Sequence, residues 1–144
     1  MPVTHIAAFE TTTQKTYQWL DELVRLGQLH DEAQAYTALR AVLHALRDRL
    51  TVEEASHLGA QLPMLVRGFY YEGWNPAKTP LRYHSLDEFL SRVEAQMRNA
   101  SLSIDAETAA REVFSLLSDK VTQGEIDDVR NMLPRDIRQL WPRD

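Results

Sequence analysis

The feature that most constrains the fold is an internal repeat. Residues 34–70 align with residues 105–141 at a constant shift of 71 positions, without a gap, and 12 of the 37 aligned pairs are identical. Unrelated segments of ordinary composition would match at roughly one position in fifteen, which gives about two or three identities. The sequence therefore predicts two copies of one structural unit, which bury their otherwise exposed faces against each other.

Apolar residues recur at helical spacing in both copies, and no segment alternates apolar and polar residues as a half-buried strand would. The first copy is expected to form helices near 14–27, 32–50, 52–61 and 63–72, and the second near 86–98, 105–120, 123–132 and 134–141. We therefore expect an all-α helical bundle of two tandem, pseudo-symmetric four-helix repeats. They form one compact domain spanning 1–144, with repeats at about 14–72 and 86–141 and a linker at about 73–84.

Capping residues mark where these helices begin. Thr51 and Glu54 form a capping box, in which the hydroxyl accepts from the backbone N–H of the glutamate and the carboxylate reaches back to the threonine N–H. Thr122 and Glu125 repeat this box in the second copy. Further helix starts are predicted from two capping side chains and from two prolines that suit a first helical turn: Asp31, Ser85, Pro63 and Pro134.

Composition limits the classes of function. The chain has 144 residues, 44% of them apolar, and no cysteine, so disulfides, thiolate metal sites and cysteine nucleophiles are excluded. The net charge is −5 and both halves are acidic, which makes nucleic-acid binding unlikely. The sequence contains no window of 18 apolar residues, so no membrane span and no membrane partner is predicted. Residues 1–12 do not resemble a signal peptide, so a cytoplasmic location is expected.

The densest aromatic segment lies in residues 69–74, where four of the 12 aromatic side chains occur within six positions. The second copy lacks most of this segment. Tyrosine and tryptophan beside an arginine are typical of binding hot spots, so the candidate binding residues are Arg67, Tyr70, Tyr71 and Trp74. In the alternative interpretation, these aromatics pack between the two halves and stabilise their contact.

A second set of candidates lies on the second helix of each copy. Arg40 and Arg111 occupy equivalent positions, His44 lies one turn after Arg40, and Asp119 follows Arg111 by two turns. If the two helices converge, these four residues could line a groove between the repeats that binds a small molecule or catalyses a reaction. The alternative is a purely structural role, because arginine and aspartate recur in both copies.

No metal, cofactor or catalytic motif is predicted. The five histidines are scattered, and His57 pairs only with Glu53, one helical turn away, as a salt bridge would require. Phosphate-binding loops and nucleophile motifs are absent. We therefore predict a non-enzymatic interaction module whose partner is another protein or a second copy of the chain.

Three stretches carry a resemblance to a known family: Leu39-Arg-Ala-Val-Leu-His-Ala-Leu-Arg-Asp-Arg-Leu50, Ala60-Gln-Leu-Pro63 and Arg67-Gly-Phe-Tyr-Tyr-Glu-Gly-Trp74. In combination they resemble the bacterial family catalogued as domain of unknown function 2267, from about Thr16 to Trp141. The resemblance implies a small, all-helical, cytoplasmic bacterial protein. It implies no activity, substrate or catalytic residue.

Overall fold

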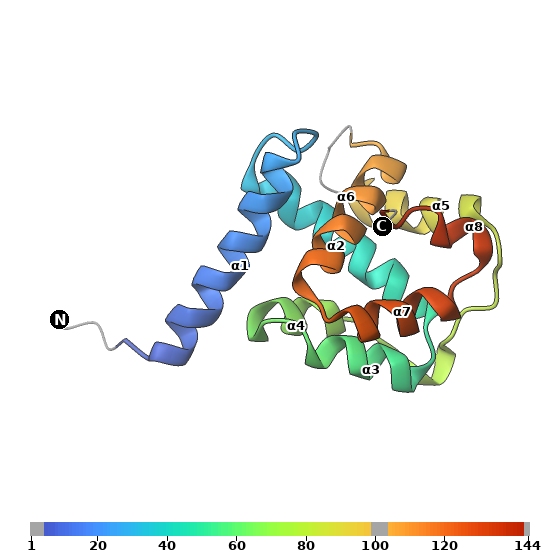
Figure 1. Ribbon diagram of the computed structural model, residues 1–144, viewed down its shortest axis with the longest axis horizontal. Helices are drawn as coiled ribbons and strands as arrows, with labels where there is room; N and C mark the ends of the chain where they lie inside the picture. The colour runs from blue at the N-terminus through green and yellow to red at the C-terminus, as the bar shows by residue number, and fades with distance from the viewer. Residues whose placement is uncertain (1–4, 99–103, 143–144) are drawn as a thin grey trace.

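The computed structural model describes residues 5–98 and 104–142, so parts of the expected 1–144 domain lie outside the described residues. Within them the fold is all-α, as predicted, with no strand. The first half holds α1 (Ala7–Arg25), α2 (Glu32–Arg49), α3 (Val52–Ala60) and α4 (Met64–Tyr71), followed by a 3-10 turn, η1 (Pro76–Lys78). The second half holds α5 (Leu86–Met97), α6 (Ala106–Lys120), α7 (Gln123–Met132) and α8 (Arg135–Arg138) (Figure 1).

The predicted capping side chains are confirmed. Asp31, Thr51, Ser85 and Thr122 each occupy the N-cap of a helix, and each side chain accepts a hydrogen bond from the backbone N–H three residues later. Such caps satisfy backbone donors that the first helical turn leaves unpaired. The helix starts of both halves are therefore encoded locally.

Helix α2 is the centre of the core. It contacts α1, α4, α5 and α6, so that helices from both halves surround it (Figure 1). Four of its alanines are buried together with larger apolar residues, and their small side chains allow neighbouring helices to approach closely: Ala35, Ala38, Ala41 and Ala45. None of the described helices has both the length and the apolar character needed to cross a membrane.

Two helices differ from their predicted bounds by more than two residues. Helix α1 begins at Ala7, two turns before the predicted start, because the prediction used the apolar residues from Tyr17 onward and the helix continues back through residues 7–16, which are mostly polar. Helix α8 ends at Arg138, whereas the prediction continued to 141. Pro142 disfavours helical backbone in the residue before it, and the preceding Leu140 and Trp141 turn inward and are buried.

The linker between the halves is packed against the bundle. The backbone N–H of Leu81 donates to the carbonyl of Asp48 at 2.8 Å, and Tyr83 is buried. The guanidinium groups of Arg49 and Arg92 lie 5.7 and 5.3 Å from the centre of the Tyr83 ring, within the range of cation–π attraction. The linker therefore joins α2 to α5 through contacts as well as through the chain.

Contacts across the halves occur in reciprocal pairs. The Thr51 hydroxyl lies 3.5 Å from the Met132 sulfur, while the amide of Gln61 donates to the Thr122 hydroxyl at 3.1 Å. A shift of 71 residues relates Thr51 to Thr122 and Gln61 to Met132. A two-fold relation between duplicated halves would produce such pairs, although the duplication itself stays a prediction.

Candidate functional site

The predicted aromatic segment lies against α3. Tyr70 is fully buried, and its hydroxyl donates to the carbonyl of Ala55 at 2.6 Å. Burial raises the pKa of Tyr70 far above its ordinary value, so the hydroxyl remains protonated. Tyr71 and Trp74 are half-buried, with ring centres 5.2 Å apart. Tyr70 is thus part of the core, whereas Tyr71 and Trp74 each keep some exposed surface.

The guanidinium of Arg67 is occupied by the backbone. Its Nε donates to the carbonyl of Gly59 at 2.9 Å, and one of its terminal nitrogens donates to the carbonyl of Leu62 at 2.9 Å. Arg138, its counterpart, donates in the same way to the carbonyl of Leu133 at 3.0 Å. Carbonyls near a helix end lack intrahelical donors, so these arginines close the turns after α3 and α7.

Arg40 and His44 face α4. Arg40 forms an ion pair with Glu72, which lowers the pKa of that carboxyl. The buried His44 ring donates from Nε2 to the carbonyl of Phe69 at 2.6 Å, which fixes the neutral tautomer with its proton on that nitrogen. Burial lowers the pKa of His44, and the nearby cation of Arg47 lowers it further.

The other two predicted groove residues lie elsewhere. Arg111 donates to the Glu107 carboxylate at 3.1 Å and to the carbonyl of Gln139 at 3.2 Å, and Asp119 is exposed at the end of α6. Within the described residues, no hydrogen bond or ion pair joins Arg40 or His44 to either of them. Arg111 instead lines an open pocket of about 690 Å³, together with three other arginines from the second half, Arg130, Arg135 and Arg138.

An apolar groove lies on the other side of the molecule, between α1, α2 and α4. We call it the α1 groove. It encloses about 580 Å³, and its apolar lining includes Tyr17, Leu20, Tyr36, Leu65 and Phe69. The rings of Tyr36 and Phe69 meet edge to face with centres 5.2 Å apart, which fixes one wall. Tyr17 is 53% exposed although it lies on the same side of α1 as the buried Leu20.

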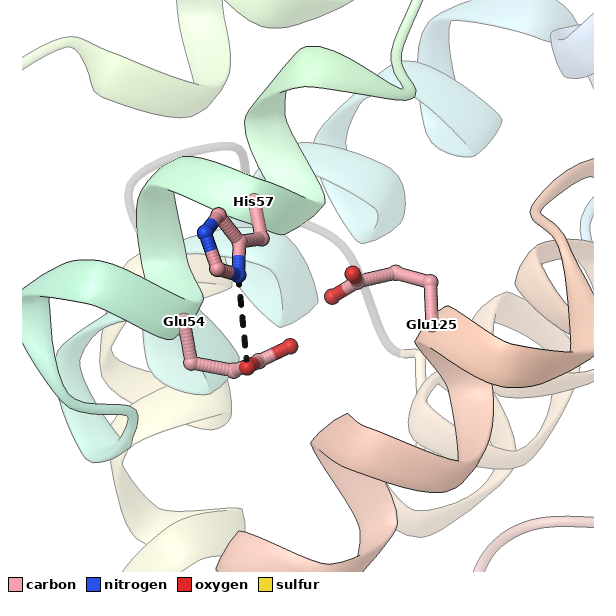
Figure 2. A group of neighbouring side chains, drawn as sticks. All are labelled: Glu54, His57 and Glu125. Carbon is pink, nitrogen blue, oxygen red and sulfur yellow. Dashed lines mark ion pairs between the residues drawn. The ribbon is translucent and has the colours of Figure 1, made fainter.

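A cluster of ionisable side chains lies where α3 and α7 meet. Glu54 and His57 come from α3 and Glu125 from α7, and all three point toward a common space (Figure 2). The two glutamates are 5% and 9% exposed. Burial raises the pKa of Glu125 to about 8, and the neighbouring Glu54 carboxyl and Asp128 raise it as well.

Sequence reasoning missed this cluster. The capping boxes predicted that both glutamates would reach back to their own helix starts, yet within the described residues only the threonine half of each box forms. The N–H of Thr122 instead donates to the Gln61 side chain at 3.1 Å. The available signal was that the aligned positions 54 and 125 both hold glutamate, since a two-fold relation between the halves would bring equivalent residues together.

Comparison with known proteins supports the resemblance carried by the sequence. No curated protein matches the chain. A family model, described as an uncharacterized conserved protein of domain of unknown function 2267, matches residues 16–140. The matched region runs from within α1 to just past α8, and so includes both halves of the bundle. The chain therefore belongs to the domain of unknown function 2267 family.

Proposed function

We propose that the protein is a non-enzymatic interaction module that self-associates through α1. The observation that carries the proposal is the apolar stripe of α1, which extends beyond the helices that cover it. Leu20 and Leu23 are buried, whereas Phe9 and Tyr17 on the continuation of the stripe are 59% and 53% exposed. An amphipathic helix is stable in water when another surface covers its apolar face.

The first turns of α1 stand away from the bundle (Figure 1). Residues 5–11 are all exposed, and the first hydrogen bond from α1 to another helix is at Thr12, whose hydroxyl accepts from the N–H of Leu65 at 2.8 Å. The protruding segment is about 10 Å long, at 1.5 Å per residue. It offers Ile6 and Phe9 beside the open end of the α1 groove.

A second copy of the chain fits this surface because helix and groove belong to one patch. In a two-fold dimer, each copy contributes the same patch and the contact closes on itself. If the axis passes near Thr13, α1 of one copy runs antiparallel to α1 of the other. A residue seven positions before Thr13 in one copy then faces the residue seven positions after Thr13 in the other. This places Ile6 beside Leu20 of the partner copy.

The charges at the groove favour this arrangement. Three acidic residues gather where the groove meets the start of α2: Asp21, Asp31 and Glu32. Desolvation and the two neighbouring aspartates raise the pKa of Glu32. The N-cap residue of α1 is Ile6, whose side chain gives no capping hydrogen bond. An uncapped helix N-terminus carries partial positive charge, so the acidic edge would stabilise the N-terminus of the partner's α1.

The oligomeric state of the protein tests the proposal. We expect wild type to sediment as a dimer at tens of micromolar, and the double variant Phe9→Ser with Tyr17→Ser to sediment as a monomer with unchanged helical circular dichroism. The matched control is Gln18→Ser, an exposed position on the same helix but off the stripe. A wild type that stays monomeric at high concentration, or a double variant that dimerises like wild type, contradicts the proposal.

The half-buried aromatics provide a second arm of the test. If Tyr71 and Trp74 form the self-association surface, replacing both by alanine should dissociate the dimer while the α1 variants leave it intact. We expect the opposite, because the two rings pack against each other and the Tyr71 ring packs against Gly59 of α3. Bacterial origin and a cytoplasmic location stay predictions of the sequence.

A small-molecule binder is the second candidate function, and the arginine pocket favours it. Arg130 and Arg135 line this pocket without a side-chain hydrogen bond inside the described residues, so their guanidinium groups are available to an anionic ligand. The pocket lies within the second half and not between the repeats as predicted. Thermal shifts with phosphate and citrate test it, since the variant Arg130→Gln with Arg135→Gln should abolish any shift seen in wild type.

A further inference from the structure

Two buried carboxyl groups meet where α3 packs on α7, and this arrangement needs a compensating group. One oxygen of Glu54 and one of Glu125 are buried without a hydrogen-bond partner in the described residues. No lysine or arginine within 5–98 and 104–142 forms an ion pair with either. A buried carboxylate is costly unless a proton, a cation or hydrogen-bond donors compensate its charge.

The third group in the cluster is an imidazole. His57 lies 3.8 Å from a Glu54 oxygen, measured from Nδ1, and its side chain is 55% exposed. One donor atom from each of the three residues lies within 4.8 Å of the other two. Figure 2 shows the three side chains directed into one space from two helices, and His57 is the exposed member of the three.

We propose that Glu54, His57 and Glu125 form a binding site for a first-row divalent metal ion that joins α3 to α7. Two carboxylate oxygens and one imidazole nitrogen are the three-ligand set that Zn²⁺ accepts in proteins, with water as the fourth ligand. Ligand distances of about 2.0–2.2 Å require the donor atoms to move about 1 Å closer together. The exposed ring of His57 is free to make this adjustment.

The chemistry of the ligands selects the class of ion. Imidazole favours zinc and its neighbours over magnesium and calcium, which prefer oxygen ligands. The ion would neutralise the two carboxylates and satisfy their unpaired oxygens. Because its ligands come from both halves, binding should stabilise the fold by mass action, since the unfolded chain does not present the three groups together.

The test is calorimetric titration of the full chain at pH 7.5 with Zn²⁺ and Co²⁺, after removal of bound metal with a chelator. We expect one ion per chain for each metal, and no comparable binding of Mg²⁺. Saturation at about a hundredfold excess over the dissociation constant should raise Tm by about 5–10 °C. For Co²⁺, the visible absorption spectrum reports the coordination geometry.

Three variants assign the site. Glu125→Gln keeps the shape of the side chain and should weaken Zn²⁺ binding more than about a hundredfold, beyond the 10–100-fold that loss of an outer-shell partner causes. His57→Ala should also weaken it more than about a hundredfold, because His57 supplies the third ligand directly. Asp127→Asn is the matched control, because Asp127 is an exposed carboxylate on α7 that accepts from Gln123 at 2.8 Å, and the affinity of this variant should equal that of wild type.

The alternative is that the two glutamates share a proton and bind no ion. Glu125→Gln would then raise Tm in the absence of metal. Added Zn²⁺ would change Tm by the same amount in wild type and in the variant, or would leave both unchanged. Either that result, or Zn²⁺ binding that Glu125→Gln leaves unchanged, overturns the proposal. Circular dichroism of each variant confirms that a loss of binding is not a loss of folding.

Discussion

Replacing Gly59 with alanine should destabilise the protein, although the same change usually stabilises a helix. Gly59 lies in the last turn of α3 and is buried. A β-carbon there would be 2.3 Å from the Tyr71 hydroxyl oxygen and 2.7 Å from the ring carbon that carries it. Carbon atoms at their optimal separation lie about 3.5–4.0 Å apart, so the Tyr71 ring must move by about 1 Å.

The magnitude follows from two opposing terms. Alanine in place of glycine gains about 0.5–1 kcal/mol within a helix. Overpacking of a well-packed site costs about 1–3 kcal/mol. The Tyr71 ring cannot move without disturbing its contacts with Tyr70 and Trp74, whose ring centres lie 4.9 and 5.2 Å away. We expect a net loss of about 1–2 kcal/mol in the free energy of unfolding.

Urea unfolding followed by circular dichroism measures this effect. Gly68→Ala is the matched control, because Gly68 is a helical glycine in α4 with no atom near its added β-carbon, and it should gain about 0.5–1 kcal/mol. In a Tyr71→Ala background the contact is removed, so Gly59→Ala should become neutral or stabilising. If Gly59→Ala stabilises wild type as much as Gly68→Ala does, the packing argument is wrong.

The remaining predictions concern buried polar groups and caps. Because the pKa of His44 is lowered in the folded protein, the stabilisation by His44 is complete above about pH 6.5 and is lost as pH falls below that value. The difference in Tm between wild type and His44→Gln should therefore shrink from pH 7.5 to pH 5. Arg47→Met should lower the free energy of unfolding in urea by about 3–5 kcal/mol. The variant removes a buried cation whose Nη1 donates to two backbone carbonyls at 2.7 and 2.9 Å. A loss below about 1 kcal/mol would refute this prediction. Thr51→Ala should cost about 1 kcal/mol as a lost cap. Thr122→Ala should cost more than Thr51→Ala, because the Thr122 hydroxyl also accepts from Gln61, and equal losses would contradict that contribution.

Much of the fold could be predicted because helix starts are local. The hydroxyl of Thr51 accepts from a backbone N–H only three residues later, so four sequence positions specify the contact. The apolar stripe of α2 likewise lies on one helix and needs no knowledge of its partners. The end of α8 was predicted wrongly because Leu140 and Trp141 continue the helical pattern while Pro142 and the core direct their backbone away from it.

The candidate sites were less predictable, because burial decides what each side chain can do. The aromatic segment pointed to binding, yet Tyr70 is buried and the Arg67 guanidinium is held by backbone carbonyls. His44 was predicted from its spacing on α2, but its exposure and its acceptor depend on α4. Sequence spacing identifies residues that share a helix face and does not identify the helix that covers that face.

The sequence by itself determined an all-α chain, its capped helix starts and its family. Each of these depends on residues close together in the chain or on the pattern of the whole sequence. Only the tertiary structure decided that Glu54 and Glu125, which are 71 residues apart, share one buried space. It also decided that the apolar stripe of α1 extends beyond the helices that cover it. The physical reason is that the protonation, metal affinity and exposure of a side chain are set by groups that packing brings near it.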